Sequence, residues 1–238
     1  MSPATPIPAS SDADPVIPAG PHPYVPRLPV PDATSVTELD AAVGELRAAA
    51  DGWVRATPEA RIRLLDEVIR ATLPVADRWT ELACLHEGLD PAGPDSAEEA
   101  TVGPYIFLRG ARFHRDAIKA IARTGAPRIP GPVRTLPDGR VTARVFPADL
   151  ADRVTYIGTN ADVWMDRSVT AESLPSTMAT PYRQPPPGRV CLVLGGGNAS
   201  SIGPLDVLHK LFVELQVVVL KMHPVMAHLD EVQAAALA

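Results

Sequence analysis

The chain has 238 residues, of which 46% are hydrophobic, and it carries a formal net charge of −6 at pH 7. This length and composition suffice for a hydrophobic core and one or two domains. The negative charge and the lack of a Lys/Arg block argue against a nucleic-acid surface, because phosphate contacts need clustered cations.

The composition also bears on the cellular compartment and on whether the chain spans a membrane. No stretch approaches the roughly 20 consecutive apolar residues of a membrane-spanning helix, so no membrane segment is expected. The two cysteines, Cys84 and Cys191, have no neighbours at metal-ligand spacing. They fit a reducing compartment, and we expect a cytoplasmic protein without a metal centre, whose partners are small molecules or proteins.

Prolines recur every few residues through residues 1–33, as in "PHPYVPRLPVP". Proline removes backbone donors and favours extended polyproline geometry. This segment is predicted to be a strap on a partner surface, anchored by Tyr24, Val25 and Leu28, or a disordered arm.

The next part, residues 34–130, has the apolar spacing of helices. From Val36 onward, apolar residues recur at spacings of three and four, which is the period of one helix face. Thr57 followed by Pro58 is typical of the start of a second helix. A third helix follows, and one or two more are predicted within residues 97–122.

Residues 131–187 change to the period of strands. The stretch "VRTLPDGRVTARVF", from Val133 to Phe146, alternates on both sides of Asp138 and Gly139. An Asp-Gly pair supplies the positive φ angles of a tight turn, so a β-hairpin is predicted here. The proline-rich "RQPPPG" further along is interpreted as a linker.

Residues 188–238 contain two apolar strand patterns around a leucine-rich helical pattern. The strands are predicted at Val190–Leu194 and Val217–Leu220, and a glycine turn follows the first. Such β-α-β units form parallel sheets, whose ligands sit at the carboxyl ends of the strands near helix N-termini. The dinucleotide fingerprint is incomplete, because Ser200 stands where its third glycine belongs.

These patterns together predict an α/β protein. It consists of a helical N-terminal region, a β-hairpin and the first β-α-β unit of a Rossmann-like nucleotide-binding domain.

The order of these elements resembles that of the NAD(P)-dependent aldehyde dehydrogenases, over about Thr34 to Ala238. The resemblance is carried by Asn198 after the first strand and Lys221 at the end of the second, with a helix and strand of matching length between them. The glycine-rich turn is also similar to that of acyl-CoA reductases of the same superfamily, which work through a thioester.

The resemblance implies roles for four residues. Asn198 would donate its amide to the oxyanion of a thiohemiacetal, and Lys221 would hydrogen-bond the adenosine ribose of NAD or NADP, with Gly196 and Gly197 also at the cofactor. It further implies an aldehyde substrate in a full-length form and a homo-oligomer assembled through the hairpin. The family's nucleophilic cysteine and basic glutamate would lie beyond Ala238, so the chain resembles a truncated N-terminal half and is predicted to be inactive alone.

A second hypothesis comes from a different class of protein. In it the chain is a non-catalytic module, a truncated or degenerate product that serves as an oligomerisation or binding partner through its hairpin and its proline-rich strap.

The remaining chemistry-bearing side chains are predicted to be structural. "HEGLD" at His86 begins like a zinc-protease helix but has no second histidine at the required place, and His223 and His228 are expected at the surface or in the second strand. The aspartates assigned to a solvated hairpin rim are Asp149, Asp152, Asp162 and Asp166. The tryptophans assigned to the core are Trp53, Trp79 and Trp164.

Overall fold

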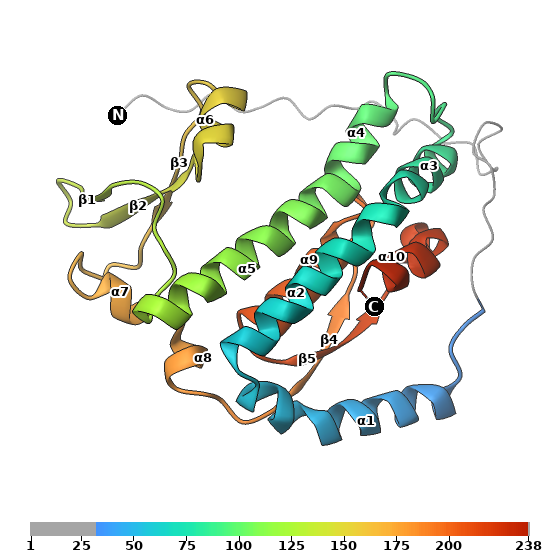
Figure 1. Ribbon diagram of the computed structural model, residues 1–238, viewed down its shortest axis with the longest axis horizontal. Coiled ribbons are helices and arrows are strands. Elements are labelled where there is room, and N and C mark those ends of the chain that lie inside the picture. The colour runs from blue at the N-terminus through green and yellow to red at the C-terminus, as the bar shows by residue number, and fades with distance from the viewer. Residues whose placement is uncertain (1–31, 238) are drawn as a thin grey trace, which may run out of the picture.

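The computed structural model describes residues 32–237, which form a mixed α/β protein with one antiparallel and one parallel sheet (Figure 1). The predicted proline-rich strap and its anchors Tyr24, Val25 and Leu28 lie outside the described residues. Within residues 32–237, no helix has the length and apolar character needed to cross a membrane.

The first part of the described chain is helical, as the apolar spacing predicted. The helices are α1 (Val36–Arg55), α2 (Pro58–Thr72), α3 (Ala76–Glu87), α4 (Ser96–Ala100) and α5 (Ile106–Thr124), with short turns at η1 (Leu73–Val75) and η2 (Thr101–Tyr105). Ser35 and Glu38 form a capping box at the start of α1. The Thr57 side chain accepts from the Ala60 amide, and Pro58 opens α2, so the predicted cap-and-proline start is confirmed.

The second half contains the strands. Its elements are β1 (Val133–Thr135), β2 (Val141–Phe146), α6 (Leu150–Thr155), β3 (Ala161–Trp164), α7 (Leu174–Thr177), α8 (Thr180–Arg183), β4 (Val190–Leu194), α9 (Ile202–Phe212), β5 (Val217–Lys221), η3 (Pro224–Leu229) and α10 (Asp230–Leu237).

The predicted hairpin is confirmed. β1 pairs antiparallel with β2. Residues 136–140 join the two strands, a longer connection than the tight turn predicted, and of Asp138 and Gly139 only Gly139 takes a positive φ, of +84°. A third strand, β3, pairs with the other edge of β2 and was not predicted. Trp164 at its end is 57% exposed, so its assignment to the core was wrong. A short edge strand offers few partners that would cover a large side chain. The oligomerisation role of this hairpin stays a prediction.

The predicted parallel pairing is also confirmed. β4 and β5 run in register from Val190 opposite Val217 to Leu194 opposite Lys221, with α9 between them in the chain. α2 runs beside α5, α5 packs on α9, and α9 packs on the parallel sheet (Figure 1). Their contact encloses the main core, whose largest fully buried side chains include Trp79, Phe107, Phe212, Leu65 and Leu208.

A buried ion pair ties the antiparallel sheet region to the helical layer. Arg109 on α5 donates to Asp152 on α6 at 2.7 Å, and Asp152 is 1% exposed. Its assignment to a solvated rim was therefore wrong, because sequence spacing gave no sign of a partner 43 residues away on another helix. Burial raises the pKa of Asp152, but the Ala148 amide and Arg109 outweigh it, so the pKa lies below its usual range.

Asp162 differs from Asp152 in its surroundings. It pairs with Arg144 at 2.6 Å across the β2–β3 edge, where both side chains remain partly exposed.

Replacing Asp152 tests this tie. Asp152→Asn leaves Arg109 without its carboxylate and should lower the free energy of unfolding by about 2 kcal/mol in urea denaturation. The matched control Asp162→Asn removes a surface pair and should cost much less. Equal losses of unfolding free energy for the two variants would contradict the conclusion that the Arg109–Asp152 pair links the antiparallel sheet region to the helices.

Candidate functional site

The structure brings the predicted site residues to one edge of the parallel sheet. The Gly195 amide donates to the Lys221 carbonyl oxygen at 2.9 Å, which joins the turn after β4 to the end of β5. Asn198 lies in that turn, and both Asn198 and Lys221 are exposed. This is the carboxyl edge of the strands, where ligands of parallel sheets bind.

The glycines of the turn are close-packed against protein. A Cβ on Gly196 would lie 2.9 Å from Cγ2 of Ile202, and one on Gly197 would lie 2.5 Å from Nδ1 of His223. The His223 ring is itself held in place, because Nδ1 accepts from the Val225 amide at 3.2 Å. Glycine is therefore needed here to admit α9 and the imidazole.

The space left beside this turn is small. The cavity lined by Gly195, Gly196 and Gln233 has a volume of about 10 Å³. Such a volume admits about one water-sized group. Oε1 of the buried Gln233, one of the lining residues, has no donor among the described residues. A pyrophosphate does not fit it.

The N-terminus of α9, which in a nucleotide-binding unit faces the phosphate, is covered by other elements. Ser200 and Ser201 are each 3% exposed. The Ser201 hydroxyl donates to the Val102 carbonyl of η2, and Nε2 of Gln233 on α10 donates to the Ser200 carbonyl at 2.7 Å. The helix start is therefore covered by other elements, and its first N–H, that of Ile202, donates to the Ala199 carbonyl at 3.3 Å.

Ser200 makes two of the hydrogen bonds that link the start of α9 to other elements. Its hydroxyl accepts from Nε1 of Trp79 on α3 at 2.9 Å. A Cβ on Gly103 of η2 would lie 2.8 Å from the same oxygen, so the missing side chain of this glycine makes room for the hydroxyl. The residue that breaks the dinucleotide fingerprint is thus a buried polar anchor. Sequence reasoning missed it, since Trp79 and Ser200 lie 121 residues apart.

Neither cysteine stands in the turn. Cys84 on α3 is fully buried, and burial followed by the charge of Glu99 raises the pKa of its thiol. A nucleophilic thiolate requires the opposite shift. Cys191 belongs to β4, where it pairs with Val218.

His86 and His228 pack against each other. The rings of His86 on α3 and His228 on η3 stack with centroids 4.1 Å apart. His228 was expected at the surface or in the second strand, and that was wrong: it is half-buried on η3. Burial, followed by the charge of His86, lowers the pKa of His228 to about 4. Among residues 32–237, no group of three or more His, Cys, Asp or Glu side chains has the arrangement of a metal site.

Comparisons of this chain with family models, with curated proteins and with solved structures found no match.

The Ser200 anchor is testable by a double-mutant cycle. Ser200→Ala leaves the Trp79 N–H buried without an acceptor and should lower the free energy of unfolding by about 1–3 kcal/mol. In the Trp79→Phe background, which has no such donor, Ser200→Ala should cost about 1 kcal/mol less. Additive losses in chemical denaturation would show that the two side chains are not coupled.

The histidine stack predicts a pH dependence of stability. Between pH about 6.5 and about 4, His228 gains a proton in the unfolded chain but resists it in the folded one, so stability should fall as pH falls through that window. His228→Phe keeps an aromatic ring and removes the proton site, so between these two pH values its melting temperature should fall less than that of the unmodified protein. His209→Phe, at an exposed histidine, serves as control. Burial also lowers the pKa of His114, which adds to the pH dependence of every variant. The test therefore compares the change of melting temperature with pH in His228→Phe with that in His209→Phe. An unchanged slope in His228→Phe would contradict the prediction.

Proposed function

We propose that this chain is a Rossmann-like nucleotide-binding unit of the aldehyde dehydrogenase type. The observation that carries the proposal is the parallel register of β4 and β5. It ends with Leu194 opposite Lys221 and so brings Asn198 and Lys221 to one edge of the sheet.

The two exposed side chains have the chemistry that the resemblance requires. The Asn198 amide is a neutral donor, and such a donor aimed at a developing oxyanion stabilises it by about 3 kcal/mol in other enzymes. Lys221 carries three N–H donors on a flexible stem, which suits the hydroxyls of a ribose.

The same edge limits how a nucleotide is held. The cavity beside the glycine turn is about 10 Å³, so a diphosphate has no place within it. The His223 ring lies against one side of Gly197, which leaves less of the turn open to a ligand. NAD or NADP would therefore be held mainly by Lys221 and Asn198 on the outside of the edge, and the affinity is expected to be weak.

Oxidation by this chain is not part of the proposal. The thiohemiacetal of the family needs a thiolate next to the amide donor. The pKa of the Cys84 thiol is raised by burial, and the Cys191 residue is part of the paired strand β4. We propose nucleotide binding without turnover of simple aldehydes.

An NMR titration of the full chain with NAD+ and NADP+ tests this function. The largest amide shifts should fall at residues 195–199 and 221–223, with a Kd of about 1 mM or weaker. Lys221→Ala should remove most of the shifts, because it deletes the main donor. The matched control is Lys119→Ala, at an exposed lysine of α5.

The other outcomes are equally informative. Micromolar binding that Lys221→Ala leaves unchanged would contradict the proposed site, as would NAD(P)H formation from an aldehyde that Cys191→Ser abolishes. No binding at all would favour the second hypothesis, a non-catalytic binding module. The exposed Val163 and Trp164 of β3 are consistent with such a module, since exposed apolar clusters mark contact surfaces.

A further inference from the structure

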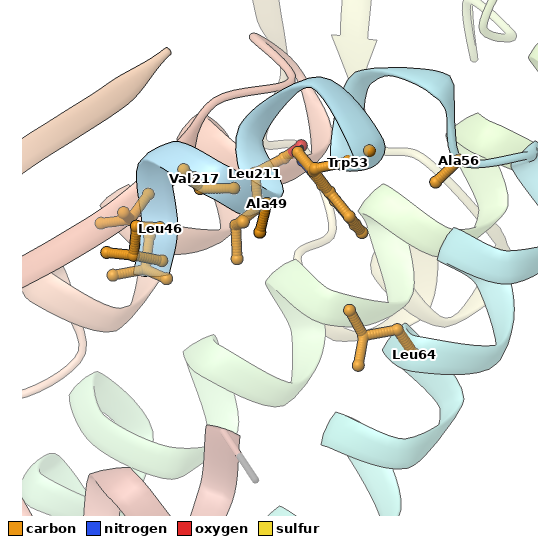
Figure 2. Close-up of a pocket in the computed structure, with 10 residues that line it drawn as sticks. Leu46, Ala49, Trp53, Ala56, Leu64, Leu211 and Val217 are labelled. Carbon is orange, nitrogen blue, oxygen red and sulfur yellow. The ribbon is translucent and has the colours of Figure 1, made fainter. Parts of the chain in front are cut away.

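An open apolar groove lies between α1, α2, α9 and β5 (Figure 2). It has a volume of about 400 Å³. In Figure 2, Trp53 of α1 and Leu64 of α2 point into the same space. The lining also includes Leu46 and Ala49 of α1, Leu211 of α9 and Val217 of β5.

The aromatic wall of the groove is fixed. Nε1 of Trp53 donates to the Leu211 carbonyl at 3.0 Å, and its ring meets Phe212 edge-on with centroids 5.6 Å apart. Its polar atom is satisfied inside the protein, so Trp53 offers the groove an apolar face.

The apolar stripe of α1 continues beyond the groove toward the start of the helix. Leu39 is 42% exposed and Val36 is 74% exposed. Both lie in the first turn of α1, at the N-terminal end of the helix. An exposed apolar stripe that joins a groove marks a surface for contact.

We propose that residues 23–30 of the same chain, "PYVPRLPV", bind in this groove. Pro23, Pro26 and Pro29 recur every third residue, which is the period of a polyproline helix. Proline-rich segments of this kind bind apolar grooves lined by aromatic side chains. Tyr24 and Leu28 supply the apolar side chains that fill it.

The tether has the right length. The groove residues Leu46 and Trp53 lie 10 and 17 positions into α1, or about 15–25 Å from its start at 1.5 Å per residue. The eight residues from Leu28 to Val36 span about 25 Å at 3.1 Å per residue. Leu28 therefore reaches the groove.

A tether this short also selects the chain's own segment over that of another copy. Linking two binding elements by a few residues gives an effective concentration in the millimolar range. Another copy at micromolar concentration competes poorly with that.

Trypsin offers a direct test on the full chain. Arg27 is the single Lys or Arg in residues 1–46, so cleavage there reports on the bound segment alone. Ala49→Glu places a carboxylate in the groove and should speed cleavage at Arg27 about tenfold, because proteolysis follows the open population. The control Ala48→Glu is the same change at the next exposed residue of α1, about 100° around the helix and outside the groove. Equal cleavage rates in the two variants would overturn the proposal.

Cysteine cross-linking identifies the occupant. Leu28→Cys with Ala49→Cys should form an intrachain disulfide at least about tenfold faster than Leu28→Cys with Ala48→Cys, measured by peptide mass mapping. Preferential cross-links between two chains would mean that another copy fills the groove, and would overturn the assignment to the same chain. Equal rates for the two pairs would overturn the docking itself.

Discussion

The hydrogen bonds that close the N-terminus of α9 hold the two halves of the described chain together. Polar groups at a buried helix start need hydrogen-bond partners, because burying them uncompensated is costly. Here the buried start of α9 lies under η2, α10 and α3, with Ser200 accepting from Trp79 and its carbonyl accepting from Gln233. α3 from the first half of the described chain and α10 from its end converge on one serine. The position of the β4–α9–β5 unit against the helical layer follows from that convergence.

This closure also decides what the sheet edge can do. In an open strand-to-helix turn, backbone N–H groups and the helix start offer a cradle to phosphate. In this chain Gly197 lies against the His223 ring, and the helix start is covered, so the backbone offers little. The polar groups that the edge exposes are therefore mainly side chains, among them the Asn198 amide and the Lys221 ammonium.

The parts of the fold that the sequence predicted correctly are those with local signals. The Thr57–Pro58 cap began a helix where expected, and the turn residues Asp138-Gly139 marked the place of the hairpin. The apolar runs of β4 and β5 marked the parallel pair, and chain order alone put Asn198 and Lys221 on one edge.

What the sequence did not predict depends on partners far along the chain. The Arg109–Asp152 pair, the Trp79–Ser200 bond and the His86–His228 stack each join segments that no periodicity connects. Each partner taken alone has the pattern of an ordinary surface or core residue. Only the packing of α3, α5 and η3 against their neighbours decides which of them are buried.

The parallel sheet itself is covered unevenly, and this explains where the exposed apolar surface lies. Leu220 meets Gly203 of α9, so the side of the sheet that carries Leu220 and its partner Val193 faces α9. Side chains alternate along a strand, and Leu192 and Leu194 therefore face away from α9, where they are 61% and 67% exposed. Parallel sheets are normally buried on both faces. The face away from α9 thus keeps a hydrophobic driving force for association, while the polar anchor at Ser200 is already satisfied within the chain. Association at that face should be driven by apolar area, and the proposed nucleotide binding at the carboxyl edge by the Lys221 charge, so added salt should weaken the nucleotide binding and spare the association.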